Sequence, residues 1–211
     1  MKKLLFCLSF LMGASVCAQD TKCITQVNFN MGKTLSTFMY ADANGNPNES
    51  LSTRSGASYS LNVGLQLGSK HLLKPELMYQ EMGAKSSVNN TLNEWILNYF
   101  GAGVGYYYTA LQKAAFSLSP GVVVNANYML SGEQVIGNNR FNIVDQKLLK
   151  PLDVVSSVAL NARFKVTDNM HVNFDYRYGF GLLDIENIEG DESEKTRNIG
   201  HLASLGLSFN L

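Results

Sequence analysis

Six charged side chains stand at alternate positions of segments that otherwise favour β-strands. Residues two apart in a strand point to the same side, so each of three pairs lies on one face of its strand. The pairs are Lys74 with Glu76, Arg163 with Lys165, and Asp175 with Arg177. Charges of both signs on one enclosed face can neutralise one another as ion pairs, or they can line a narrow path for ions.

Three histidines, His71, His171 and His201, are the candidates for a general base. His171 is expected at the rim of a tight turn and His201 roughly ten residues up the neighbouring strand, which separates them by about 30 Å at ~3.4 Å per residue. They cannot share a metal ion or an active site. His201 could act with Ser204 or Ser208 on lipid, but these serines are expected on the opposite face of the strand. The sequence therefore predicts no catalytic residue, no metal site and no cofactor.

The overall composition excludes several classes of protein. Lys plus Arg is 17 and Asp plus Glu is 17 in 211 residues, so there is no basic excess to hold nucleic acid. Only 16% of the residues are charged, while there are 18 Gly, 10 Tyr and 11 Phe. This composition favours strands and disfavours helix bundles and disorder.

The first residues are typical of a cleaved secretory signal peptide. A cationic start, Met1-Lys2-Lys3, precedes an apolar stretch from Leu4 to Val16 and small residues before Gln19. We expect residues 1–18 to be removed and residues 19–211 to form the mature domain. Cleavage takes two of the three cysteines and leaves Cys23 alone, so no internal disulfide is expected.

Polarity alternates with a period of two over most of the mature chain. From Met170 to Leu182, even-numbered residues are apolar or aromatic and odd-numbered residues are polar or glycine. Strands have this period and helices do not. Around Asn98 to Gly101 the alternation is interrupted, which indicates a bulge or a glycine kink. Eight strands are predicted, over Cys23–Phe38, Arg54–Leu67, Leu72–Lys85, Glu94–Thr109, Ala115–Leu130, Asp153–Val166, Met170–Asp184 and Asn198–Leu211.

The connections between these segments alternate in length. Tight turns are expected at 68–71, 110–114 and 167–169, and long polar loops at 39–53, 86–93, 131–152 and 185–197. Short turns and both termini at one end, with long loops at the other, are typical of a bacterial outer-membrane barrel. The rival is a soluble barrel of lipocalin type with an apolar interior. Because the polar face carries Gly, Asn, Ser and charges, we predict an all-β, eight-stranded antiparallel up-and-down transmembrane β-barrel.

In such a barrel the side chains just fill the interior, so charges there must pair. With the 167–169 hairpin centred on Asp168, Arg163 faces Asn173 and lies diagonal to Asp175, within cross-strand reach. We therefore predict an internal salt-bridge plug, with a narrow gated path for ions or small solutes as the alternative. The predicted network consists of Lys74, Glu76, Arg163, Lys165, Asp175 and Arg177.

One motif resembles that of a known family. Leu73-Lys74-Pro75-Glu76-Leu77-Met78-Tyr79, followed by Gly83-Ala84-Lys85, resembles the Pro-Glu-Leu-x-Tyr…Gly hallmark of the PorT-like outer-membrane β-barrel family of Gram-negative bacteria, whose barrels are OmpA-like. Val27 to Leu35 is similar to the first strand of that family. The resemblance implies the fold and a location in the outer membrane, and it does not imply activity in a secretion system.

The last eight residues fit the terminal signal of barrel assembly. Ser204, Gly206, Phe209 and Leu211 occupy its polar, glycine and hydrophobic positions, with Leu211 in place of the commoner aromatic. The barrel-assembly machinery is therefore an expected partner.

We expect a monomeric, non-enzymatic outer-membrane protein with a structural or partner-binding role. Its other expected partners are outer-membrane lipid, lipopolysaccharide and an unidentified extracellular or envelope partner of the loops. No binding of nucleic acid is expected. A porin-like channel and a lipid-modifying enzyme are the alternatives. The loop at 131–152 is long enough to fold over the barrel mouth or to bind outside it. The acidic loop at 185–197 lacks the spacing of a calcium loop.

Overall fold

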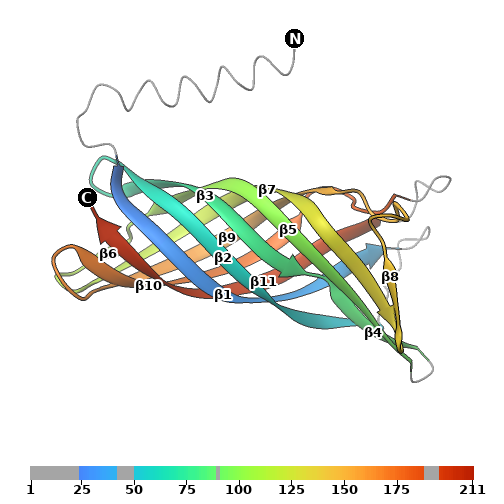
Figure 1. Cartoon of the computed structure of the whole chain (residues 1–211). Helices are drawn as coiled ribbons and strands as arrows, with labels where there is room; N and C mark the ends of the chain where they lie inside the picture. The colour runs from blue at the N-terminus through green and yellow to red at the C-terminus, as the bar shows by residue number, and fades with distance from the viewer. Residues whose placement is uncertain (1–23, 42–49, 89–90, 188–194) are drawn as a thin grey trace, which may run out of the picture.

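The computed structural model describes residues 24–41, 50–88, 91–187 and 195–211, and they form a β-barrel (Figure 1). The predicted signal peptide, residues 1–18, and Cys23 lie outside the described residues. Within the described ranges, no helix has the length and apolarity to cross a membrane.

The barrel wall closes on itself. Its strands are β1 (Ile24–Ala41), β2 (Leu51–Leu67), β3 (His71–Met82), β4 (Ala84–Val88), β5 (Thr91–Tyr108), β6 (Leu111–Gln112), β7 (Phe116–Ile136), β8 (Asn139–Asn142), β9 (Leu152–Lys165), β10 (Met170–Gly181) and β11 (Lys195–Asn210). Eight of them form an antiparallel ring in the order β1, β2, β3, β5, β7, β9, β10, β11. β11 pairs back with β1, from Asn210 opposite Gln26 to Lys195 opposite Ala41. The predicted eight-stranded up-and-down transmembrane barrel is confirmed.

The two ends of the barrel differ as the connection lengths predict. Tight turns at 68–70 and 166–169 lie at one end, together with β6, the start of β1 and the end of β11 (Figure 1, left). Gly68 in the first of these turns has a φ of 70°, a conformation that glycine adopts without strain. We call this the short-turn end, and the opposite end the loop end.

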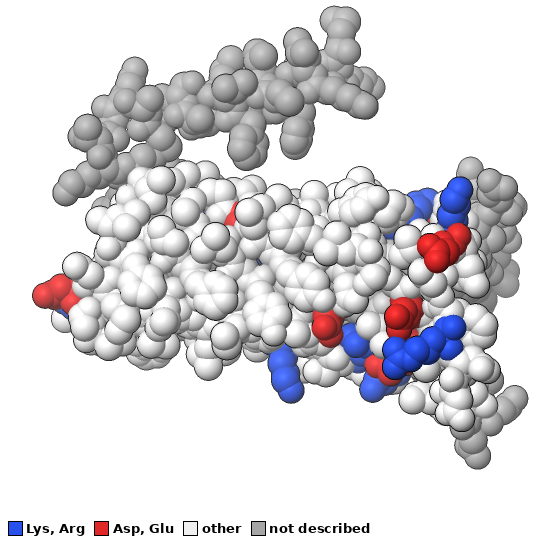
Figure 2. All heavy atoms as spheres, viewed as in Figure 1, with Lys and Arg blue, Asp and Glu red and all other residues white. Residues whose placement is uncertain are grey.

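Apolar side chains face outward and polar ones inward over most of the wall. Phe29 and Leu205 are 48% and 59% exposed, whereas Asn28 and Ser204 on the same strands are buried. Figure 2 shows a face whose middle is largely uncharged and whose Lys, Arg, Asp and Glu side chains lie mostly toward the loop end, with a few at the tip of the short-turn end. A lipocalin-type barrel needs the opposite arrangement, so that rival is wrong.

Two segments predicted as loops form strand hairpins at the loop end. Residues 86–88 and 91–93 of the predicted loop 86–93 belong to β4 and to the start of β5, and these two strands pair from Lys85 opposite Glu94. β7 runs on to Ile136 and pairs with β8, so only the turn 137–138 and residues 143–151 of the predicted loop 131–152 lie outside the named strands. Here the outer face meets water and inward side chains such as Leu97 are apolar. A pattern chosen for membrane strands therefore fails to recognise these segments.

The predicted irregularity in the strand that begins near Glu94 is present. The register of β5 against β7 shifts between Asn98 and Tyr99, within the interrupted stretch. A second irregularity separates β3 from β4 at Gly83, which has a φ of 139°. A Cβ atom there would collide with the carbonyl group of Trp95, so glycine is required at this close approach.

Candidate functional site

A bidentate ion pair crosses the lumen between opposite walls. Arg177 of β10 and Glu76 of β3 are joined by Nη1–Oε1 at 2.5 Å and Nη2–Oε2 at 2.8 Å. Three strands separate β3 from β10 on either side of the ring. Asp175 accepts a third bond from Arg177 Nε at 2.6 Å, and all three side chains are buried. The guanidinium fork therefore ties the two walls together at the centre of the barrel.

Neutral side chains complete the hydrogen bonding of these carboxylates. Asn125 donates to Glu76 at 2.8 Å, and Tyr107 and Asn161 donate to Asp175 at 3.1 and 3.3 Å. Buried charges are tolerated only when they are paired and hydrogen-bonded in this way.

Lys74 is the second cation at this level. Its Nζ donates to Asn161 Oδ1 at 3.1 Å and lies 4.6 Å from the ring centre of Tyr107. Because Lys74 and Arg177 balance Glu76 and Asp175, the group carries no formal net charge. We call Lys74, Glu76, Tyr107, Asn125, Asn161, Asp175 and Arg177 the lumen network.

The other two charges of the predicted plug lie nearer the short-turn end. Arg163 faces Asn173 across β9 and β10, as the hairpin predicts, but its Nη2 donates to Asn210 Oδ1 at 3.1 Å. No ion pair joins it to Asp175, whose oxygens are bound by Arg177, Tyr107 and Asn161. For Arg163 the predicted link to the plug is therefore wrong.

Lys165 is exposed and does not enter the lumen. It is the last residue of β9, and its Nζ lies 2.6 Å from Asp168 Oδ1 in the adjoining turn. At the rim of the barrel a lysine on the inner face reaches water, so its place in the alternation does not show that its side chain is buried in the lumen. Its assignment to the network is corrected.

Tyr107, Asn125 and Asn161 were missing from the predicted network. Strand alternation places all three on the inner face, and that signal was present in the sequence. No sequence signal specifies which side chains meet across the lumen, because that depends on the stagger of the strands around the closed ring.

The loop end of the lumen is filled by an apolar core. Its buried members are Phe38, Met82, Ala84, Leu97, Tyr99, Met129, Ile143 and Ile185, with Leu51, Trp95 and Leu149 packed against them. Five of the buried members are inward side chains of the long ring strands, whereas Ile143 and Ile185 come from the connections after β8 and β10. We call this set the loop-end core.

Hydrogen bonds fasten these two connections across the barrel mouth. Lys150 N donates to Ile185 O at 2.7 Å, and Asn187 N donates to Leu148 O at 3.0 Å. Leu149 and Glu186 form an antiparallel bridge. The segments 143–150 and 184–187 therefore form a lid on the loop-end core, and we call them the lid.

Asp184 holds the lid to the start of β11. Its Oδ1 accepts N–H bonds from Thr196 at 2.9 Å and Glu186 at 3.2 Å, and Lys150 Nζ lies 3.4 Å from Oδ2. Partial burial alone would raise the pKa of this carboxyl group. The two N–H donors and the lysine outweigh burial and lower the pKa below its ordinary value.

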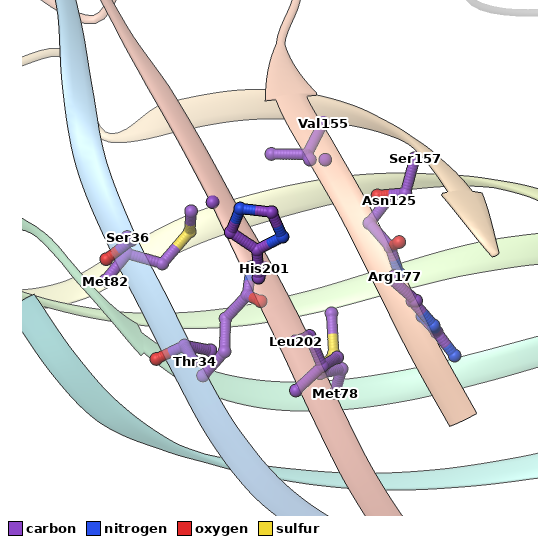
Figure 3. Close-up of a pocket in the computed structure, with 13 residues that line it drawn as sticks. Thr34, Ser36, Met78, Met82, Asn125, Val155, Ser157, Arg177, His201 and Leu202 are labelled. Carbon is purple, nitrogen blue, oxygen red and sulfur yellow. The ribbon is translucent and has the colours of Figure 1, made fainter. Parts of the chain in front are cut away.

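Within the described part of the barrel, one space lies on each side of the lumen network. A cavity of about 30 Å³ lies above it, lined by Thr34, Ser36, Asn125 and Arg177 among others (Figure 3). Its volume suits one or two water molecules. A second space of about 330 Å³ lies at the short-turn end, where Arg163 lines it. The network and the loop-end core therefore divide the lumen.

The histidines that were considered as bases lie on the outer surface or at the rim. His201 Nδ1 is 2.7 Å from the hydroxyl of Tyr176, and His71 Nδ1 is 2.6 Å from the hydroxyl of Tyr106. Ser204 and Ser208 are buried on the lumen side of β11, away from the exposed His201. Among the described residues, no three His, Cys, Asp or Glu side chains converge as a metal site.

The residues of the expected assembly signal lie in the last part of β11 and directly after it. Ser204 faces the lumen, whereas Phe209 and Leu211 are exposed, the latter at 76%. Gly206 lies where a Cβ atom would meet Asn30 and the backbone of Phe29.

A closed ring with an apolar exterior and a polar, ion-paired interior defines the class of eight-stranded transmembrane β-barrels found in bacterial outer membranes. Two solved structures of this class are similar to the chain. Neisserial surface protein A (NspA) matches with a TM-score of 0.50 and 14% identity, over 88% of this chain and 96% of that one. OprG from Pseudomonas aeruginosa matches with a TM-score of 0.50 and 9% identity, over 90% and 97%.

These likenesses show the fold. No protein-family model matches the sequence, and no curated protein sequence matches it.

Proposed function

We propose that the chain is a non-enzymatic integral outer-membrane protein with a closed lumen, which presents its loop end to an extracellular or envelope partner. The observation that carries this proposal is the Arg177–Glu76 pair, which joins opposite walls at 2.5 and 2.8 Å. The loop-end core closes the same lumen a second time. In outer-membrane barrels, short turns face the periplasm and long loops face outward.

Export by a cleaved signal peptide and assembly by the barrel-assembly machinery belong to this proposal. The pattern of residues 1–18 supports the first. The position of Phe209 and Leu211 on the outside of the last strand supports the second, because these side chains are accessible to another protein before the ring closes. We propose a monomer, since the pairing of β1 with β11 leaves the ring without a free strand edge for another chain.

Kinship with the PorT-like family is also proposed, and the motif now has a physical role. Glu76 of the Pro-Glu-Leu-x-Tyr motif is the carboxylate that meets Arg177 across the lumen. Leu77 is half exposed on the outer face, and Tyr79 packs against Tyr59 with ring centres 6.2 Å apart. The motif thus serves both faces of β3.

Lipopolysaccharide is the proposed lipid partner, and Lys33 is the side chain that favours it. Lys33 is exposed on the outer face of β1, opposite Ala57 of β2 and Ala203 of β11. It lies nine positions from the start of the strand. At ~3.4 Å per residue and a tilt of ~40° this is about 23 Å from the short-turn end, near the upper border of an apolar band ~25 Å tall. A lysine at that level suits the phosphates of outer-leaflet lipid.

Single-channel recording tests the closed lumen. The purified full chain, reconstituted in planar bilayers, is expected to give no stable unit current. Heat-modifiable gel migration of the same sample shows that the barrel is folded. Regular unit currents from the folded wild type would overturn the proposal in favour of the channel alternative.

Lipid analysis tests the non-enzymatic role. His201 is hydrogen-bonded to Tyr176 and the nearby serines face inward, which supports an absence of lipid chemistry. Mass spectra of lipid A from cells with and without the protein are expected to be the same. A change that disappears in a His201→Ala variant would contradict the proposal.

A further inference from the structure

The space at the short-turn end is a polar hollow with one cation in its wall. It measures about 330 Å³ and is lined by Gln66, Thr109, Gln112, Ser117 and Arg163, among others. Such a volume is at the lower end of the range for small-molecule sites. It is separate from the lumen network, because neither Glu76 nor Arg177 lines it.

The charge of Arg163 is not neutralised by its surroundings. Among the described residues, its side chain donates one hydrogen bond, from Nη2 to the neutral amide oxygen of Asn210 at 3.1 Å. Its Nε is buried and has no partner among the described residues. Among the described residues, no carboxylate lies within ion-pair distance of the Arg163 guanidinium. A partly buried cation in this position gains stability from an anion.

Two polar nitrogens close to Arg163 in the strand register also lack partners among the described residues. Asn173, directly across the strand pair, has its Nδ2 buried without a partner among the described residues. His171 lies two residues before Asn173, and its Nδ1 is also buried without a hydrogen-bond partner among the described residues. The nearest acid of the adjoining turn, Asp168, is bound by Lys165 at 2.6 Å.

The rim around the hollow is also positive. Lys70 and Lys113 stand in the short turns, and neither has a carboxylate partner among the described residues. Lys70 Nζ lies 5.8 Å from the ring centre of Tyr108. An anion that approaches this end therefore meets an attractive field before it reaches Arg163.

We propose that the short-turn hollow is a binding site for a small oxyanion, a carboxylate or phosphate group, which Arg163 holds. The guanidinium fork matches both kinds of group. The neutral amides and hydroxyls of the lining offer hydrogen bonds to the rest of the ligand. On the proposed orientation the ligand arrives from the periplasm, but binding itself does not depend on whether the lumen conducts.

Titration calorimetry on the full chain in detergent micelles tests the site. One arm uses D-alanyl-D-alanine as a peptide carboxylate and the other uses inorganic phosphate, so the two sources of the oxyanion are distinguished. Binding of at least one probe is expected, with a Kd of about 1 mM or tighter. If neither probe binds the folded wild type at 20-fold higher concentration, the proposal is overturned.

Matched variants locate the binding. Arg163→Gln is expected to weaken it at least tenfold, and Asn173→Ala two- to fivefold. Lys113→Gln removes a charge from the same rim without touching the lining, and it is expected to leave the Kd within a factor of two. Equal weakening by Arg163→Gln and Lys113→Gln would show diffuse attraction only and would overturn the assignment. Heat-modifiable migration confirms the fold of each variant.

Discussion

The lower and upper parts of the lumen are built on the same strands but have opposite chemistry. Toward the short-turn end, β5 places Gly103, Gly105 and Tyr107 inside, and exposes Val104 and Tyr106. Toward the loop end the same strand buries Leu97 and Tyr99.

The inversion follows from the surroundings of the wall. Where the outside meets hydrocarbon, polar side chains must be enclosed and paired with one another. Where the outside meets water, burial of apolar side chains stabilises the strands, as it does in a soluble barrel. One continuous wall thus has a membrane section and an aqueous section, and each is closed by a different kind of contact.

The largest loss of stability is expected from breaking the ion pairs of Arg177 in the lumen network. Arg177→Ala leaves Glu76 and Asp175 buried without their cation, which costs about 3–5 kcal/mol of the free energy of unfolding. Urea titration in phospholipid vesicles measures this. The quadruple variant Lys74→Met, Glu76→Gln, Asp175→Asn, Arg177→Met removes all four charges of the lumen network and is expected to recover most of the loss. A quadruple variant as unstable as Arg177→Ala would contradict this explanation.

A smaller effect is expected from the loop-end core. Leu97 is fully buried there, and Leu97→Ala is expected to cost about 2–4 kcal/mol through lost apolar contact and the cavity left behind. Leu92→Ala, on the same strand but 50% exposed, is the matched control and should change little. Fluorescence of Trp95, the single tryptophan, reports this region directly. Equal destabilisation by the two variants would argue against an enclosed core.

The lid is expected to loosen in acid. Because the folded pKa of Asp184 is lowered, its contribution is fully present above the ordinary pKa of aspartate. That contribution is lost as the pH falls through the lowered folded value, below about pH 4. The emission of Trp95 should shift to the red over this range while the barrel stays folded. The shift should be absent in Asp184→Asn, and an unchanged shift there would assign it to another group.

The smallest effect is expected from the ion pair at the rim. Lys165 and Asp168 lie 2.6 Å apart, the same distance as Arg177 and Asp175. Lys165 and Asp168 are exposed, whereas Arg177 and Asp175 are buried. Water and salt screen an exposed pair, so Asp168→Asn should leave the urea midpoint unchanged. A clear loss of stability would show that short distance, rather than enclosure, decides the strength of these pairs.

The membrane section of the fold can be predicted from the sequence more clearly than the aqueous section. Alternation from Met170 to Leu182, together with the polar and glycine residues of one face, predicts which face is inside, and the short hairpin predicts that Arg163 faces Asn173. Both follow from local geometry. The same pattern cannot recognise β4 or β8, because polarity there no longer reports the hydrocarbon.

The centre of the site could be predicted only as a set of inward charges. That Glu76 meets Arg177, 101 residues away, depends on the stagger of the closed ring, which no short segment encodes. The assignment of Lys165 to the network was wrong for a local reason. Lys165 is the last residue of its strand, so its side chain reaches water although alternation places it on the inner face. Tyr107 was within reach of sequence reasoning, as alternation places it inside.

A double-mutant cycle on Arg177 and Glu76 tests the central claim most directly. Arg177→Met, Glu76→Gln and the double variant are unfolded in the same lipid vesicles, and the free energies of unfolding are compared. A pair that joins opposite walls predicts a coupling of about 2–3 kcal/mol. A coupling near zero would mean that the two side chains do not meet across the lumen, and would contradict the account of how the barrel is closed.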